Sequence, residues 1–155
     1  MLRDPGDVFE DDPTIRDSDV LYRMVRYDTV HWDGEMAVRA RTNAFQDQPP
    51  IRAQQMGYSA VALSVYLGSV LQRDGVDPAS LVEDSRWQGG YGVASITAGQ
   101  ARREGQGVAR DPLPDSAAHC LVFAQSGRKK TNGQSKALAR HSVIVVPPPR
   151  PASAQ

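Results

Sequence analysis

Residues 118–146 read AHCLVFAQSGRKKTNGQSKALARHSVIVV, and this segment organises the architecture that we expect for the chain. The stretches 118–125 and 142–146 are short, mostly apolar and rich in β-branched or aromatic side chains, which suits strands buried within a sheet. A polar loop (126–134) and a short helix (135–141) lie between them. We therefore expect both strands in one sheet, with the basic loop exposed to solvent.

Further strands and helices are expected on both sides of this unit. Alternating or β-branched residues predict strands at 20–27, 36–45 and 93–97, and a short one at 107–110. Apolar spacing predicts a helix at 59–74, although the β-branched residues in its first half leave a strand there as an alternative. Thr97 and Gln100 have the spacing of a capping box, which predicts a second helix at 98–104.

The order of these elements predicts an α+β or α/β fold, with a single compact domain built on a central mixed β-sheet and about three packed helices. A chain of 155 residues with 40% hydrophobic residues is long enough for one such core. We expect an acidic mobile leader at 1–17, the globular domain at 18–147 and a Pro-rich flexible tail at 148–155.

Composition restricts the location and the partners that we expect. The 18 basic and 18 acidic side chains cancel, which argues against attraction of the whole protein to nucleic acid or to an anionic membrane. Cys120 is the single cysteine, and the N-terminus lacks the features of a signal peptide, so a cytoplasmic location is expected. We expect Cys120 to be a buried apolar residue, and we expect no membrane span.

The charges are separated along the chain. Residues 1–19 hold seven acidic side chains, whereas 126–141 hold five basic ones and no acid. Two solvated faces explain this separation, and a leader that folds across the basic loop is the alternative. The basic side chains are candidates for binding an anion or, weakly, nucleic acid: Arg128, Lys129, Lys130, Lys136 and Arg140.

The basic loop does not have the spacing of a Walker A motif. Five residues separate Gly127 from Gly133, and Gln134 stands where that motif needs a lysine. A generic contact with an anion and an ordinary solvated turn are both consistent with the loop. No metal centre is expected, because the histidines are far apart and lack ligand spacing: His31, His119 and His141.

Arg23 lies among apolar neighbours in the strand expected at 20–27, so it needs an acidic or a carbonyl partner. Such an arginine can hold a phosphate or a carboxylate through two hydrogen bonds, and a structural ion pair is the alternative role. The Leu21–Arg23 stretch resembles the early strand of RES-type and related ADP-ribosyltransferase-like domains, which carry an arginine in a similar Tyr-Arg context. The resemblance ends there: 41–45 matches the family's Arg-Trp-Asn segment only distantly, and no matching glutamate follows.

Two further side chains, Ser64 and His119, join Arg23 as weak catalytic candidates, and with Phe45 they converge if the sheet forms a cleft. His119 at the start of a strand can reach such a cleft or serve as a structural residue. His119 and Cys120 do not form a nucleophile and base pair, because adjacent residues of a strand point to opposite faces.

Three hypotheses for function follow, and they leave open whether the chain is an enzyme. The first is a small cytosolic accessory or protein-interaction domain with an unidentified protein partner and no cofactor. The second is an enzyme or degenerate enzyme that binds a phosphorylated ligand, such as NAD or a nucleotide, through Arg23. The third is weak, salt-dependent contact with nucleic acid through the basic segment 128–140.

Overall fold

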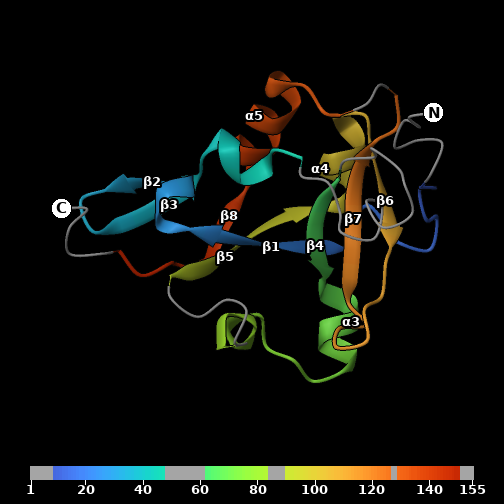
Figure 1. Ribbon diagram of the computed structural model, residues 1–155, viewed down its shortest axis with the longest axis horizontal. Coiled ribbons are helices and arrows are strands. Elements are labelled where there is room, and N and C mark those ends of the chain that lie inside the picture. Colours follow the sequence, from blue (N-terminus) through green and yellow to red (C-terminus); the bar gives the residue numbers. More distant parts are fainter. Residues whose placement is uncertain (1–8, 48–61, 84–89, 127–128, 151–155) are drawn as a thin grey trace.

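The computed structural model describes residues 9–47, 62–83, 90–126 and 129–150. Figure 1 shows a six-stranded sheet with the strand order β6-β7-β4-β1-β5-β8 and a separate hairpin, β2-β3. The strands are β1 (Val20–Arg26), β2 (Val30–Asp33), β3 (Met36–Ala40), β4 (Leu63–Leu67), β5 (Tyr91–Thr97), β6 (Gln106–Arg110), β7 (His119–Ala124) and β8 (Val143–Val146). The α-helices are α3 (Gly68–Arg73), α4 (Ala98–Arg103) and α5 (Asn132–His141), and the 3-10 helices are η1 (Tyr27–Thr29), η2 (Thr42–Phe45) and η3 (Pro78–Glu83).

The fold is α+β, as the sequence predicts, but the described strands of the main sheet pair antiparallel rather than as a mixed sheet. The two strands of the 118–146 segment do lie in this sheet, as β7 and β8. They run parallel to each other, as strands joined by a helical crossover can, but β4, β1 and β5 lie between them. The crossover therefore creates no parallel neighbours.

Strand β4 occupies the first half of the predicted helix at 59–74, so the helix prediction is wrong for 63–67 and the strand alternative is confirmed there. The strand lies between β1 and β7, and four of its five residues are buried, with Ser64 the exception. A strand buried on both faces lacks polar alternation, so its sequence resembles that of a buried helix. Helix α3 begins only at Gly68, and residues 59–61 lie outside the described part of the chain.

Two helices begin at capping boxes. Thr97 caps α4 through a bond from the Gln100 N–H to its hydroxyl, as the sequence predicts. Helix α5 begins at residue 132, three residues before the predicted start, because Thr131 and Gln134 form a second capping box. The strand predicted at 36–45 ends at Ala40 and is followed by η2.

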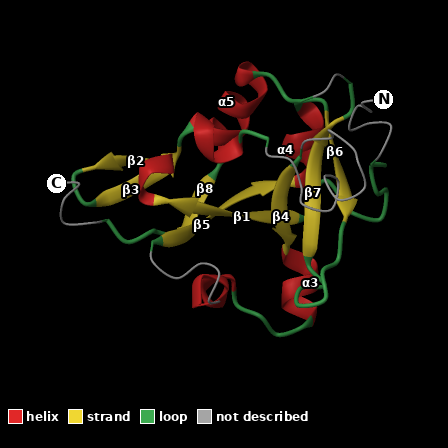
Figure 2. Ribbon diagram, in the orientation of Figure 1, coloured by secondary structure: helices red, strands yellow, loops and turns green. Residues whose placement is uncertain are grey.

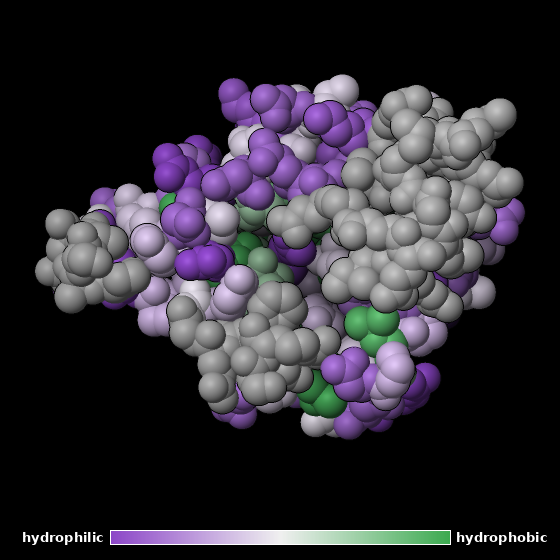
Figure 3. Space-filling view, in the orientation of Figure 1, coloured by the Kyte–Doolittle hydropathy of each residue, from purple (hydrophilic) through white to green (hydrophobic). Residues whose placement is uncertain are grey.

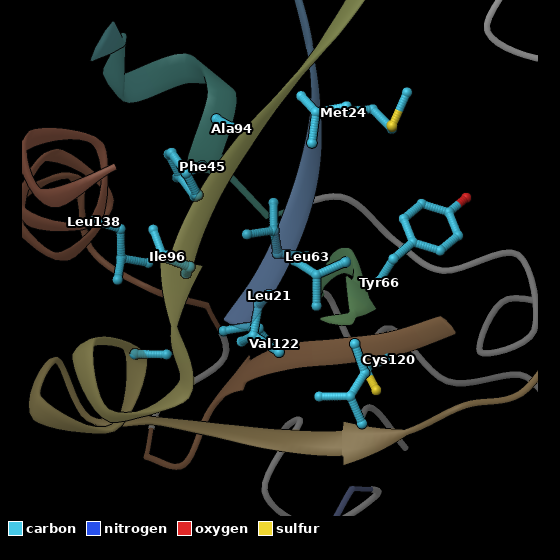
Figure 4. Packing of buried hydrophobic residues seen from close by; sticks show 14 of the residues in the cluster. Leu21, Met24, Phe45, Leu63, Tyr66, Ala94, Ile96, Cys120, Val122 and Leu138 are labelled. Carbon is cyan, nitrogen blue, oxygen red and sulfur yellow. The ribbon is translucent and has the colours of Figure 1, made fainter. Parts of the chain in front are cut away.

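Segment η2 and helix α5 form a layer over one face of the sheet, and Figure 2 shows them together on one side of the strands. In Figure 4, Phe45 of η2 and Leu138 of α5 lie beside Ile96 of β5, and all three are buried. The Ser135 hydroxyl donates to the Phe45 carbonyl at 3.0 Å, which ties α5 to η2. The register pairs Leu21 with Ile96, so this layer covers the face of β1 that also carries Arg23.

The described part of the acidic N-terminal segment packs on the domain. Ile15 is 1% exposed within the hydrophobic core. Arg102 of α4 forms ion pairs with Asp11 at 3.2 Å and with Asp17 at 2.7 Å. The aspartates of 9–17 thus pair with Arg102 and Arg110 rather than with the basic segment that was the alternative partner.

The predicted domain boundaries after residues 17 and 147 stay predictions, and residues 1–8 and 151–155 lie outside the described part of the chain. The described tail returns to the hairpin, where the Arg150 guanidinium lies 5.2 Å from the centroid of the Trp32 ring. Among the described residues, no helix combines the length and the apolar character that crossing a membrane requires.

Gly92 of β5 provides a test of how β8 is placed. A Cβ at Gly92 would lie 2.2 Å from the Val146 carbonyl oxygen and 2.4 Å from the Pro148 nitrogen. These are backbone atoms, which cannot move without disturbing the pairing of β5 with β8, so Gly92→Ala is expected to lower the free energy of unfolding by about 2–3 kcal/mol. Urea denaturation measures this change.

Gly133→Ala is the matched control, because the nearest atom to an added Cβ is the Thr131 Oγ1 at 3.8 Å, an ordinary contact. Alanine is the better residue within α5, so the control is expected to gain about 0.5–1 kcal/mol of stability. A Gly92→Ala protein as stable as the wild type would show that β8 does not lie against β5 as described.

Candidate functional site

Strands β1 and β4 separate beside Arg23. The last paired residues of these two strands are Tyr22 and Tyr66. Backbone groups alternate in direction along a strand, and the Leu67 N–H donates toward β7. The carbonyl of Ser64, three residues earlier, therefore faces β1, at the point where β1 no longer supplies a backbone donor.

The Arg23 side chain occupies this opening. Its Nε–H donates to the Ala44 carbonyl at 2.9 Å, and its Nη1 donates to the Ser64 carbonyl at 3.1 Å. One guanidinium thus joins β1 to β4 and to η2. The sequence-based expectation that Arg23 needs an acidic or carbonyl partner is met by carbonyl groups.

Arg23 is half-buried, and it remains charged although burial desolvates its guanidinium. Burial lowers the pKa of Arg23 to about 10, and Tyr91, Tyr66 and Asp47 oppose this shift. Among the described residues, its hydrogen bonds go to neutral carbonyls, and no carboxylate forms an ion pair with it. In Figure 3 the visible surface is hollowed near the centre of the view, over the region where β1 runs in Figure 1.

A buried ion pair lies close to Arg23. The Lys130 ammonium contacts one carboxylate oxygen of Asp47, and the Lys130 backbone N–H donates to the other oxygen at 2.8 Å. The side chains of Lys130 and Asp47 are 0% and 2% exposed. Burial lowers the pKa of Lys130, the Asp47 carboxylate opposes this shift, and the charge of Arg23 adds to the lowering.

The prediction that the basic loop at 126–134 is exposed to solvent is therefore wrong for Lys130. Asp47, which is far away in the sequence, supplies a buried counter-charge. Lys129, Lys136 and Arg140 are exposed. Arg128 lies outside the described residues. The proposed role of the exposed members in binding an anion or nucleic acid stays a prediction.

His119 lies on the other face of the sheet. It pairs in register with Tyr66, which pairs with Tyr22, so all three share the face opposite to Arg23. The His119 Nδ1 lies 3.2 Å from a carboxylate oxygen of Asp111 and 2.9 Å from its carbonyl oxygen. His119 and Arg23 consequently do not meet in one pocket formed by the described residues.

The predicted polar set converges only in part. Ser64 contributes its backbone carbonyl to Arg23, while Phe45 is fully buried in the core next to Ala44. Cys120 is 1% exposed, as expected for a structural residue, and burial raises its pKa to about 12. Within the described ranges, no group of three or more His, Cys, Asp or Glu side chains could hold a metal ion.

Sequence reasoning missed Asp47. It is the only acidic residue between Glu35 and Asp74, and this isolation was the signal that could have identified it. Its pairing with Lys130 depends on how η2 and α5 pack together.

A separate exposed apolar surface lies at the other side of the molecule. Strands β3 and β8 lie near each other, and they carry the large hydrophobic side chains that are most exposed among the described residues. This β3–β8 surface consists of Met36 (69% exposed), Val38 (53%), Val143 (60%) and Val145 (43%). It lies on the edge strand β8 and on the hairpin, away from Arg23.

The Asp47–Lys130 pair is expected to be needed for stability. Removing one partner leaves an uncompensated buried charge, so Lys130→Met or Asp47→Asn is expected to cost about 3–5 kcal/mol. The double variant Asp47→Asn with Lys130→Met removes both charges and is expected to recover at least half of this loss. Urea denaturation of the four proteins measures the coupling, and additive losses in the double variant would contradict a direct pair.

Comparisons with protein-family models, with curated proteins and with solved structures find no match for this chain, so the site rests on its own geometry.

Proposed function

We propose that this protein binds a phosphorylated ligand, such as NAD or another nucleotide, with Arg23 on a phosphate group. The observation that carries the proposal is the desolvated Arg23 guanidinium, whose hydrogen bonds from the described residues go only to two neutral carbonyls. A desolvated cation without an ion-pair partner gains free energy from a bound anion.

The geometry of Arg23 supports the same ligand class. A guanidinium has five N–H donors in a planar fork, and the carbonyls of Ala44 and Ser64 use two of them. Those two bonds hold the side chain in place, so little rotamer entropy is lost when a ligand binds. Three donors remain for phosphate oxygens, which the guanidinium can bind in a bidentate manner.

Local charge also supports an anionic ligand. Lys130 and Asp47 neutralise each other, which leaves Arg23 as the net positive charge of the cluster formed by the described residues. The Leu21–Arg23 stretch resembles the corresponding strand of ADP-ribosyltransferase-like domains, and this resemblance favours NAD or a related nucleotide within the class. The proposal concerns binding, and it assigns no reaction.

Binding should depend on Arg23. Isothermal titration calorimetry with NAD, ADP-ribose and ATP is expected to show binding of at least one of them to the wild type. A charge-assisted hydrogen bond contributes about 1.5–3 kcal/mol, so Arg23→Ala is expected to weaken that binding about 10- to 100-fold. The titrations are made at a temperature where circular dichroism shows every variant folded.

Arg26→Ala is the matched control, because Arg26 lies on the same strand with a side chain that is 51% exposed. It removes the same charge from the opposite face of β1, so affinity is expected to change less than about threefold. Nucleotide binding that Arg23→Ala leaves intact, or the absence of binding by all three nucleotides, would remove the proposal.

A second candidate function is protein interaction through the β3–β8 surface. Exposed apolar side chains that gather in one place mark interaction sites more often than scattered ones do. Met36 also lines a shallow depression with Ile144 and Pro147, and Ile144 lies on the face of β8 opposite to Val143 and Val145, so both faces of β8 carry accessible apolar side chains. This observation supports an accessory role with a protein partner of apolar surface.

Charged substitutions on this surface should abolish binding of such a partner without unfolding the domain. Val38→Glu and Val143→Glu change exposed side chains, so stability is expected to stay within about 0.5 kcal/mol of the wild type. Tagged wild type is expected to retain a specific partner from the native host that both variants lose. Gln72→Glu, an exposed change on α3, is the control and should retain it. If the wild type purifies as a monomer, and no co-purifying protein is lost from both variants while the control retains it, this second function is contradicted.

A further inference from the structure

The cluster around Arg23 contains two positive charges and one negative charge. The cations are Arg23 of β1 and Lys130, which precedes α5. The carboxylate belongs to Asp47, which follows η2. The three groups are electrostatically coupled, since Arg23 acts on Lys130 and Asp47 acts on both cations. The described residues therefore present a net charge of one positive unit to a ligand.

Asp47 is fixed in this arrangement. One of its carboxylate oxygens contacts the Lys130 ammonium, and the other accepts the Lys130 backbone N–H at 2.8 Å. Its side chain is 2% exposed, so water screens its charge poorly. The Asp47 carboxylate is therefore held in its ion pair with Lys130 near Arg23, where it opposes additional negative charge on a ligand.

A net charge of one unit favours a ligand group with one negative charge. The attraction between a fixed charge and a ligand grows in proportion to the ligand charge. The cost of taking an ion out of water grows with the square of that charge, so a dianion loses about four times as much hydration as a monoanion. In a desolvated site to which the described residues supply one unit of compensating charge, the second negative charge costs more than it gains.

Given the proposed function, we infer that the site selects a phosphate group with a single negative charge, as in a phosphodiester or the bridging diphosphate of a dinucleotide, over a terminal phosphomonoester. Asp47 is the residue that sets this preference, through its charge rather than through a contact with the ligand.

A matched pair of probes tests the preference without any variant. Adenosine 5′-monophosphate carries a phosphomonoester with a second pKa of about 6, and its 5′-methyl ester is a phosphodiester with one charge at all pH values from 5 to 8. The methyl ester is expected to bind about tenfold more tightly at pH 8. Affinity for the monophosphate is expected to fall as pH rises from 5 to 8, because the dianion replaces the monoanion, while affinity for the methyl ester stays constant.

Two variants then test the role of Asp47, because they change the net charge of the cluster formed by Arg23, Lys130 and Asp47. Asp47→Asn removes the negative charge of the cluster, and with Lys130 protonated the net charge rises to two units, so the preference for the methyl ester is expected to disappear or reverse. Asp47→Asn combined with Lys130→Met returns the net charge to one unit, and the tenfold preference is expected to return. A structural role alone would affect both probes equally in each variant.

The outcomes separate the inference from the proposed function. If neither probe, nor any of the nucleotides tested above, binds in a manner that depends on Arg23, the proposed function fails. If both probes bind through Arg23 and the monophosphate binds as tightly as the methyl ester at pH 8, the function stands and the inference is overturned. Since the pH series uses the wild-type protein, that outcome is available even if Asp47→Asn does not fold.

Discussion

The Ser64 carbonyl sets the constraint on which the centre of this fold depends. Strand β1 stops pairing with β4 after Tyr22, so the backbone donor that would meet this carbonyl is missing. A polar group left without a partner costs about 1–3 kcal/mol. Arg23 replaces the missing donor, and the same guanidinium also reaches Ala44 in η2. Strands β1 and β4 can separate at this point because the Arg23 side chain supplies the hydrogen-bond donor that the strand ladder lacks.

The Arg23 guanidinium places a positive charge in a desolvated region, where the charge needs hydrogen bonds or a counter-charge. A lysine in the same position could supply donors, but its ammonium lacks the planar fork that reaches two carbonyls on different segments. The ion pair of Lys130 with Asp47 adds two more charges nearby without adding net charge. The pair also joins Asp47, two residues after η2, to Lys130, the residue before the cap of α5. Packing and electrostatics therefore hold the layer of η2 and α5 over the sheet together.

The sequence predicted those features that depend on local pattern. The alternation in 20–27 placed Arg23 among apolar neighbours on one face of its strand, and the spacing of Thr97 and Gln100 marked the start of α4. The equivalent spacing of Thr131 and Gln134 would have placed the start of α5 correctly, but the polar loop obscured it. Strand β4 could not be distinguished from a helix, because burial on both faces removes the alternation that identifies a strand.

Contacts between distant segments were beyond the reach of local pattern. The burial of Lys130 requires Asp47, which lies 83 residues away in the chain. Runs of basic residues are usually solvated, so a pattern argument places Lys130 with its neighbours in water. Likewise, alternation puts Arg23 and His119 each on one face of its own strand, but only the register of β1, β4 and β7 shows that these faces are opposite.

The two candidate surfaces share one stretch of backbone. Strand β3 ends at Ala40, and η2 begins at Thr42, so a single residue separates the hairpin from the segment that holds Arg23. The Ala40 N–H donates to the buried Ser142 hydroxyl at 3.3 Å, which links β3 to the junction of α5 and β8. A partner that displaced β3 would consequently act on Ala44 and Asp47 through a short and well-anchored connection. The proposed protein interaction at the hairpin and the proposed ligand binding at Arg23 are therefore compatible within one structural unit, rather than rival uses of one surface.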